Sequence, residues 1–251
     1  SHIYGVSAGA CHMCSYLSRQ KGRALSVSVD YLDTRRYCSL ESLLTSGDLF
    51  NVDFCYHLIP DYLYPYDYDT FYASPMCLKV GATDCATGRC HWFSRENGDD
   101  LIRDSIASSS MPLLAPMQEI AGRQYLDGGI ADSIPVGQAM QDGWEKQVIV
   151  LTQNKGYVKK PNKLMPLIRL RYRRYPALCH TMQQRHIDYN RSLQAAQQLE
   201  QQGKAVIIQP SQPMVLHRVE KDVDKLQAAY ENGYSDAAAA WERIQRLFEQ
   251  E

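Results

Sequence analysis

The sequence predicts an α/β protein with a three-layer α/β/α sheet and a mostly helical C-terminal extension. Strand-like and helix-like patterns alternate along the first part of the chain, and the continuous apolar run Gln147–Thr152 is typical of a strand buried on both faces. A third observation comes from the start of the chain. There the apolar stretch Ile3–Val6 leads through Ser7 into Ala8-Gly9-Ala10, whose small residues can open a helix.

Length and composition allow a sizeable core but give no sign of a nucleic-acid partner. The chain has 251 residues, of which 45% are hydrophobic, so it can form one large domain or a domain plus an extension. The formal net charge of −1 gives no global electrostatic attraction to nucleic acid. No apolar run approaches the roughly 18–20 residues needed to span a bilayer.

The first half of the chain shows five further elements. A helix is expected from about Ala8 to Lys21. Two strands, Met76–Thr83 and Arg89–Phe93, form a hairpin in which Asp84 is read as a turn residue. The helix Leu101–Ser110 is expected to carry Arg103 and Asp104 on its outside, and Arg123–Leu126 is a short strand.

The C-terminal part changes in composition after Asn154. A basic run with interleaved leucines, residues 159–174, is either a solvated helix face, which is the favoured interpretation, or a contact with an anionic membrane surface. A helix over Thr181–Gln202 and a strand over Ala205–Gln209 follow. Two helices are then expected, one ending at Asn232-Gly233 and one capped by Ser235, with buried apolar residues at Trp241, Ile244 and Phe248.

Residues 49–75 are rich in aromatic side chains and are broken by prolines. Tyrosine combines apolar area with a polar end, so this segment could cap a site and line a groove for an acyl chain. The alternative is an irregular segment that packs its rings against the edge of the domain. The sequence leaves both interpretations open, and each can hold for different rings.

The strongest chemical signal is the Gly-x-Ser-x-Gly pattern formed by Gly5, Ser7 and Gly9. A serine on a tight strand-to-helix turn exposes its hydroxyl, and the backbone N–H of the next residue, Ala8, can face a developing oxyanion. Both glycines are expected to be required because a Cβ at either position would clash with nearby backbone. This pattern alone is a weak signal, since it also occurs in ordinary turns.

Two further segments make the pattern specific. Residues 107–116 read Ala-Ser-Ser-Ser-Met-Pro-Leu-Leu-Ala-Pro, and Asp127-Gly128-Gly129 follows an apolar pair. In combination with the early Gly-x-Ser-x-Gly, these segments resemble the patatin-like phospholipases. The match is densest over residues 3–17 and 76–151, and the C-terminal part is similar to the extension of a bacterial subgroup of that family.

This resemblance implies a patatin-like sheet with a nucleophile elbow, in which Ser7 is the nucleophile and Asp127 is its base. Gly128 and Gly129 would let that backbone approach the elbow without a side-chain clash. The implied activity is hydrolysis of carboxylic esters of phospholipids, lysophospholipids or related acyl lipids through an acyl-enzyme, without a cofactor or metal. We expect residues 1–155 to form the catalytic region and residues 156–251 a helix-rich extension packed on it.

The resemblance also implies a glycine-rich oxyanion loop upstream of the elbow. Nothing precedes Ser1 in this sequence, so we expect the chain to be an N-terminally incomplete form of a hydrolase. Loss of one oxyanion donor typically costs about 3–4 kcal/mol in the activation barrier. The sequence therefore leaves open whether these 251 residues alone are active.

Two other functions remain open from the residues. An α/β-hydrolase-type esterase would use a Ser-Asp-His triad, with the histidine supplied by His180, His186 or His217. A non-catalytic lipid- or partner-binding protein would use the aromatic segment 49–75 instead. If the chain is a hydrolase, the expected partner is its acyl-lipid substrate, and the protein is expected to contact a membrane surface transiently.

The eight cysteines do not indicate a metal site or a disulfide framework. Cys11 and Cys14 form a Cys-x-x-Cys pair, but they fall in the helix after Ser7, where small buried residues are needed. Their scattered spacing favours buried, reduced thiols. A cytoplasmic location, peripheral to a membrane at most, is expected, while the sequence does not indicate an oligomeric state.

Overall fold

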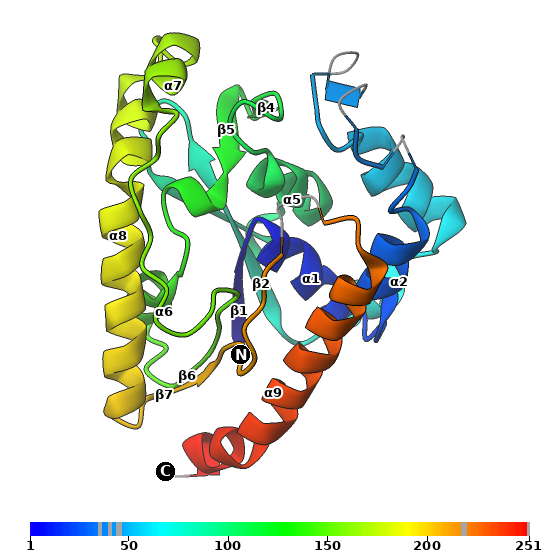
Figure 1. The fold of residues 1–251 in the computed structure, drawn as a ribbon, viewed down its shortest axis with the longest axis vertical. Helices are drawn as coiled ribbons and strands as arrows, with labels where there is room; N and C mark the ends of the chain where they lie inside the picture. The colour runs from blue at the N-terminus through cyan, green and yellow to red at the C-terminus, as the bar shows by residue number, and fades with distance from the viewer. Residues whose placement is uncertain (35–36, 40–41, 44–46, 217–219, 250–251) are drawn as a thin grey trace. The chain divides into compact units, whose positions relative to one another are not determined.

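A computed structural model describes residues 1–34, 37–39, 42–43, 47–216 and 220–249 (Figure 1). These residues form two compact units. The first unit combines Ser1–Ser133 with Pro161–Arg185, and the second combines Ile134–Lys160 with His186–Glu251. Each unit is thus built from two stretches of chain, and each is described by itself below.

The first unit is organised around strand β2, Cys77–Asp84, the central strand of a mixed sheet. The hairpin partner β3, Cys90–Ser94, pairs antiparallel with one edge of β2, as the sequence predicted. The other edge carries two strands in succession. Parallel β1, His2–Val6, pairs with β2 up to Gly81, and antiparallel β5, Arg123–Asp127, begins its pairing at Ala82. A short strand β4, Gln118–Ile120, pairs with β5.

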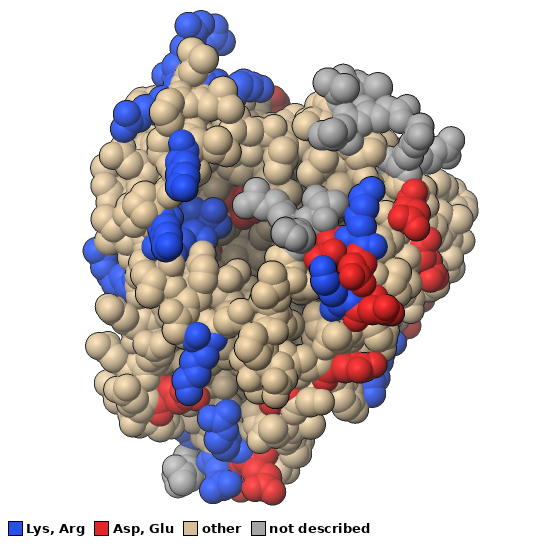
Figure 2. Space-filling model, viewed as in Figure 1, with Lys and Arg blue, Asp and Glu red and all other residues tan. Residues whose placement is uncertain are grey.

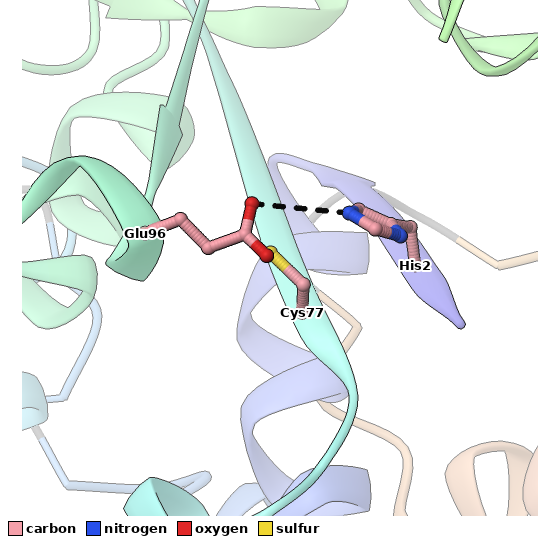
Figure 3. A group of neighbouring side chains, drawn as sticks. All are labelled: His2, Cys77 and Glu96. Carbon is pink, nitrogen blue, oxygen red and sulfur yellow. Dashed lines mark ion pairs between the residues drawn. The ribbon is translucent and has the colours of Figure 1, made fainter. Parts of the chain in front are cut away.

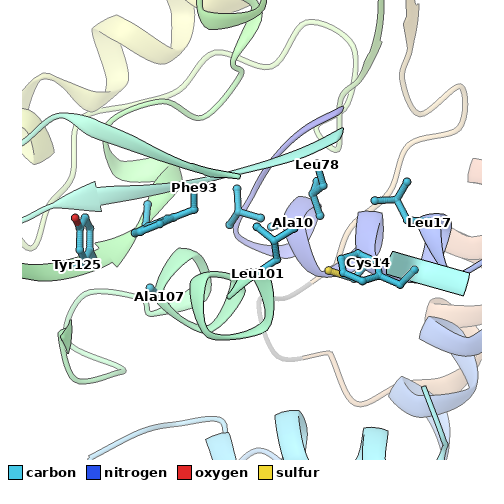
Figure 4. Packing of buried hydrophobic residues seen from close by; sticks show 11 residues of the cluster. Ala10, Cys14, Leu17, Leu78, Phe93, Leu101, Ala107 and Tyr125 are labelled. Atoms are coloured by element: carbon cyan, nitrogen blue, oxygen red, sulfur yellow. The ribbon is translucent and has the colours of Figure 1, made fainter. Parts of the chain in front are cut away.

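One face of this sheet is covered by two helices. Helix α1, Ala8–Leu17, and helix α5, Leu101–Ser109, pack their small and apolar residues against alternate positions of β2 (Figure 4). Side chains at every second strand position share a face, which explains why Leu78, Val80 and Ala82 all belong to this cluster. The small side chains of Ala10 and Ala107 are fully buried and allow the helices to lie close to the sheet.

The opposite face is covered by helix α7, Met165–Arg171, and by the beginning of helix α8, Pro176–Gln201. Ile168 and Tyr172 pack with Leu126 of β5 in one buried cluster, which also includes Leu178 and Met182. The first unit therefore has helices on both faces of its sheet. This confirms the predicted α/β class. The central sheet is mixed, since it contains parallel and antiparallel pairs.

The remaining elements of the first unit are short. The segment rich in aromatic residues forms a π-helix, η1, Phe54–Leu63, and helix α4, Tyr68–Ala73. Phe54 and Phe71 are buried, whereas Tyr62 and Tyr72 are exposed, so packing at the domain edge accounts for only some of the rings. The others are α2, Arg23–Asp30, and the single-turn helices η2, Arg95–Asn97, and η3, Gly128–Ile130.

The second unit contains a two-stranded parallel sheet and long helices. Strand β6, Gln147–Val150, pairs with β7, Ala205–Ile208, and the later part of α8 packs on them through Ala196 and Leu199. Helix α6, Val136–Gln141, precedes β6. The strand predicted over 147–152 is present over residues 147–150, and it pairs with β7 rather than with the five-stranded sheet. The expected burial on both faces was wrong, because Val148 and Val150 are 39% and 63% exposed.

The two helices predicted at the C-terminus are one continuous helix, α9, Val223–Glu249. Gly233 lies inside this helix, where a glycine costs about 1 kcal/mol but does not end it. The expected burial was also wrong, because Trp241 and Phe248 are 58% and 52% exposed. The buried stripe instead follows Ala240, Ile244 and Leu247, which recur at helical spacing and pack on β7.

None of the helices in the described ranges is long and apolar enough to cross a membrane. All eight cysteines are free thiols, and four of them are buried, namely Cys14, Cys38, Cys77 and Cys85. Burial raises the pKa of Cys14, Cys55 and Cys85 to about 12, so these side chains act as small protonated groups. This agrees with the prediction of buried, reduced thiols.

Asp104 was predicted on the outside of its helix and is instead buried. It shares the inner side of α5 with Leu101, Ser105 and Ser108, since residues 3, 4 and 7 positions apart lie on one face. Its Oδ2 atom has no hydrogen-bond partner within the part of the chain that the structure describes. Burial, with a smaller effect from nearby Asp99 and Asp100, raises the pKa of Asp104 to about 7.

This raised pKa predicts a pH-dependent stability that Asp104→Asn should remove. Between about pH 4 and pH 7 the folded chain keeps a proton that the unfolded chain has lost, so stability falls as the pH rises through this range. At about 1.4 kcal/mol per pKa unit, the loss by pH 8 is up to about 4 kcal/mol. Urea unfolding from pH 4 to pH 8 should show the variant gaining stability relative to wild type as the pH rises. Asp33→Asn removes one carboxylate from an exposed position and is the matched control. Parallel curves for wild type and Asp104→Asn would contradict the assignment.

Candidate active site

Ser7 lies at a sharp turn between β1 and α1. Its backbone has φ 53° and ψ −130°, a conformation that residues other than glycine rarely adopt. Helix α1 begins directly afterwards, and the N–H groups of Ala10 and Cys11 donate to the Ser7 carbonyl at 3.0 and 3.3 Å. The Ser7 side chain is therefore held at the start of a helix, as the Gly-x-Ser-x-Gly pattern predicted.

The turn is fixed to the sheet through Ser108 of α5. The Ser7 backbone N–H donates to Ser108 Oγ at 2.8 Å, and Ser108 Oγ donates to the carbonyl of Gly81 at 2.6 Å. Ser108 is fully buried. In the sequence, the serine-rich segment 107–116 contributed to the family resemblance, but Ser108 itself was assigned no role. The run of three serines at the end of the predicted helix was the one sequence feature that could have indicated this role.

The Asp127 carboxylate contacts the Ser7 hydroxyl directly. Ser7 Oγ donates to Asp127 Oδ2 at 2.7 Å, and the Gly129 N–H donates to Asp127 Oδ1 at 2.7 Å. Strand pairing explains how residues 120 positions apart meet. Val6 pairs with Gly81 and Asp127 pairs with Ala82, so the ends of β1 and β5 meet at adjacent positions on the same edge of β2.

The backbone of Asp127 is also held on both sides. Its N–H donates to the Ser110 carbonyl at 2.8 Å, and its carbonyl accepts from Thr83 Oγ1 at 2.8 Å. The Ala131 N–H donates to the same threonine oxygen at 3.2 Å. Because these partners come from the residue after α5, from β2 and from the turn after Asp127, the carboxylate has little freedom to leave Ser7.

Two glycines near the elbow leave no space for a side chain. A Cβ on Gly5 would lie 2.7 Å from Ala10 Cα, and one on Gly128 would lie 1.9 Å from the Gly81 carbonyl oxygen. A Cβ on Gly129 would be 3.1 Å from Asp127 Oδ1. The expectation that Gly9 is equally constrained was wrong, since a Cβ there meets no atom of the described residues within 4 Å. Gly9 is exposed on the first turn of α1.

The start of α1 offers polar hydrogens beside Ser7. Ala8 and Gly9 are exposed, and their N–H groups lie in the first turn, where no helical carbonyl precedes them. The aligned peptide dipoles also place partial positive charge at this end of the helix. An anionic oxygen that forms next to Ser7 Oγ would therefore meet a favourable environment.

Among the described residues, no histidine of the triad alternative lies between the hydrogen-bonded side chains of Ser7 and Asp127. His180 is exposed on α8, and His186 belongs to the second unit. His217 lies outside the described residues. In a Ser-His-Asp triad the imidazole separates the serine from the carboxylate, whereas here these two groups are directly bonded.

Arg185 and Ser133 were not singled out in the sequence, yet both support the turn after Asp127. Arg185 Nε donates to the Gly129 carbonyl at 2.5 Å, and Ser133 Oγ donates to the same oxygen at 2.6 Å. Arg185 comes from α8, 58 residues beyond Asp127, so no local pattern could have connected them. Both hydrogen bonds hold the Gly128-Gly129 backbone in place.

Among the described residues, one group of three side chains has the donor types of a metal site, namely His2, Cys77 and Glu96 (Figure 3). Their ligand atoms lie within 4.8 Å of one another, with His2 Nε2 3.9 Å from Glu96 Oε2. Glu96 is 62% exposed, and Cys77 Sγ is in hydrogen-bond contact with Ser94 Oγ. His2 begins β1 and Ser7 follows its end, so this group borders the opposite end of the strand from Ser7. The expectation that catalysis needs no metal stays a prediction.

Comparison with known families agrees with this fold. The sequence model of the family described as "Patatin-like phospholipase" matches residues 1–140, which is more than half of the chain. The chain therefore belongs to the patatin-like phospholipase family. Residues 175–249 match a second family, described as a domain of unknown function, DUF6363.

One similar curated protein is an uncharacterized protein, YjjU, from Escherichia coli strain K12. It is 28% identical over 154 residues, which cover 59% of this chain and 42% of that protein. The aligned region thus spans about two fifths of the relative's length.

The contrast between Gly128 and Gly9 predicts opposite outcomes for two alanine substitutions. Gly128→Ala should destabilise the fold by about 3 kcal/mol or more, because its methyl group would overlap the Gly81 carbonyl. Gly9→Ala should be neutral or stabilising by up to roughly 1 kcal/mol, since alanine favours a helix. Urea unfolding of both variants measures the difference. Equal stability of the two would contradict the close approach of Gly128 to β2.

Proposed function

We propose that the chain is a serine acyl hydrolase that cleaves carboxylic esters of phospholipids or related acyl lipids through a Ser7–Asp127 dyad. The observation that carries the proposal is the 2.7 Å hydrogen bond from Ser7 Oγ to Asp127 Oδ2 at a strained strand-to-helix turn. Membership of the patatin-like phospholipase family supports the hydrolase class and the acyl-lipid substrate.

In the acylation step, Asp127 takes the proton from Ser7 Oγ while this oxygen attacks the ester carbonyl carbon. The carbonyl oxygen becomes an oxyanion and accepts hydrogen bonds from the N–H groups at the start of α1, those of Ala8 and Gly9. The tetrahedral intermediate collapses, the carbon–oxygen bond to the alcohol breaks, and Asp127 returns its proton to the departing alkoxide. The acyl group remains on Ser7 as an ester.

In the deacylation step, a water molecule takes the place of the alcohol. Asp127 accepts a proton from this water as its oxygen attacks the acyl carbonyl, and the second tetrahedral intermediate releases the carboxylic acid. The same proton then returns to Ser7 Oγ. The two hydrogen bonds that fix the Asp127 backbone, from Thr83 and to Ser110, keep the carboxylate at the position that both steps require.

The aromatic segment supports a place for the acyl chain. Tyr56 of η1 is in hydrogen-bond contact with Cys11, which lies one helical turn after Ser7 on the same side of α1. Tyr66 of the same segment donates to the Cys14 carbonyl at 2.7 Å. The segment thus lies along the helix that begins at the nucleophile, and we assign it to the apolar part of the substrate.

Labelling with a fluorophosphonate tests the dyad. We expect one covalent adduct on the peptide that contains Ser7, no adduct with Ser7→Ala, and at least about 100-fold slower labelling with Asp127→Asn, which keeps the shape but removes the base. Ser15→Ala, two turns further along α1, is the matched control and should label normally.

Four outcomes would contradict the proposal. Labelling of another residue would remove Ser7 as nucleophile, and unchanged labelling of Asp127→Asn would remove Asp127 as base. No adduct on a chain shown to be folded, together with acyl-lipid binding that survives Ser7→Ala, would favour a non-catalytic lipid-binding protein. Loss of labelling in His180→Asn, His186→Asn or His217→Asn would favour the triad.

A further inference from the structure

Helix α7 exposes a row of leucines although its other side is well buried. Leu164, Leu167 and Leu170 are 55%, 50% and 69% exposed, and their spacing of three residues places them along one side of the helix. Ile168 and Tyr172 fill the buried side. Single exposed leucines are common on protein surfaces, but two on a seven-residue helix and a third at its N-cap form an apolar patch.

The same helix lies within a strongly basic and acid-free stretch. The chain has no Asp or Glu between Glu145 and Asp188, although its net charge is only −1. Lys and Arg side chains gather over α7 in the space-filling view (Figure 2). The basic residues on and beside the helix are Lys163, Arg169, Arg171, Arg173 and Arg174, all of them exposed. Within the described ranges, none of these five forms an ion pair with a carboxylate.

The buried side of α7 is attached to the strand that carries Asp127. Ile168 and Tyr172 share a cluster with Leu126, the residue before Asp127, and with Ile130 just beyond Gly129. Tyr172 also accepts a hydrogen bond from the Leu113 N–H at 3.0 Å. A surface that binds α7 would therefore be held at a fixed distance from the candidate active site within the same unit.

We propose that α7, with the five basic residues on and beside it, docks on the surface of an anionic phospholipid bilayer. The leucines enter the boundary between headgroups and acyl chains, and the Lys and Arg side chains bind the lipid phosphates. This combination of an apolar side with flanking cations is the pattern of helices that lie in the plane of a membrane interface. It deepens the proposed function, because it would present the Ser7–Asp127 site to lipids in a membrane.

Charge and shape favour this occupant over the alternatives. A nucleic acid would use the cations but leave the exposed leucines without a partner. A protein partner would need a groove for the leucines and also acidic side chains to pair with the basic residues beside them. A bilayer that contains anionic lipid meets both requirements with one surface.

Vesicle co-sedimentation of the 251-residue chain tests the docking. The measurements use the Ser7→Ala background, so that no lipid is hydrolysed, and vesicles of phosphatidylcholine with or without phosphatidylglycerol. We expect binding to the anionic vesicles and at least about tenfold weaker binding to pure phosphatidylcholine. Replacing Leu167 and Leu170 by Gln, or Lys163, Arg173 and Arg174 by Gln, should each weaken binding to the anionic vesicles about tenfold or more.

The matched control removes three basic residues elsewhere. Arg191, Lys225 and Arg246 each lie next to a carboxylate in an ion pair, and their replacement by Gln should leave vesicle binding within about twofold. Equal loss in this control would reduce the effect to net charge and overturn the proposal, as would equal binding to both kinds of vesicle. Binding to nucleic acid that depends on the same five cations, without binding to vesicles, would assign the surface to another partner.

A second readout separates this proposal from the proposed function. These measurements use chains that keep Ser7. The variant with Leu167→Gln and Leu170→Gln should hydrolyse a short-chain ester dissolved in water at the wild-type rate. It should hydrolyse ester lipids in anionic vesicles at least about tenfold more slowly than wild type. Absence of all ester hydrolysis would count against the dyad while leaving the co-sedimentation result intact. Equal loss on both substrates would overturn the docking role.

Discussion

The candidate site depends on the use of one edge of strand β2 by two strands that arrive from opposite directions. Parallel β1 occupies this edge as far as Gly81, and antiparallel β5 takes over at Ala82. Both strands end at this junction, so the residues at their ends, Ser7 and Asp127, meet there. The 2.7 Å hydrogen bond between their side chains follows from this register. A shift of β5 by one residue would turn the Asp127 side chain to the other face of the sheet.

Other features of the unit follow from the junction. Two backbones that end at adjacent positions of one strand must pass close to it, and this explains why Gly128 has no room for a Cβ beside the Gly81 carbonyl. The Ser7 backbone is held in an unfavourable conformation, and Ser108 compensates by accepting from its N–H while donating to Gly81. Strain of this kind persists only where the surrounding structure fixes it. Buried Ser108 and the small residues of α1 provide that support.

Much of this arrangement could be predicted from the sequence. The features that could not be predicted depend on tertiary packing or on contacts between distant segments. The elbow, the Asp-Gly-Gly turn, the β2–β3 hairpin and the mixed α/β class each have a local pattern or a family motif. The burial of Asp104 and the continuity of α9 through Gly233 depend on packing and not on local preference. The contacts of Arg185 and Ser108 with the site join distant segments, so no single stretch of sequence reveals them. The freedom at Gly9 shows that a motif position need not have the steric reason that the motif suggests.

Intact-mass measurement after rapid mixing with a p-nitrophenyl acyl ester tests the dyad most directly, because it observes the intermediate that the mechanism requires. The account predicts one acyl group per chain, located on Ser7 by peptide mapping, that forms with a burst of p-nitrophenol and then decays in water. Asp127→Asn should slow both its formation and its decay, since the carboxylate serves both steps. An acyl group on another residue, or ester turnover that persists in Ser7→Ala, would contradict the central claim that the junction on β2 assembles a catalytic Ser7–Asp127 pair.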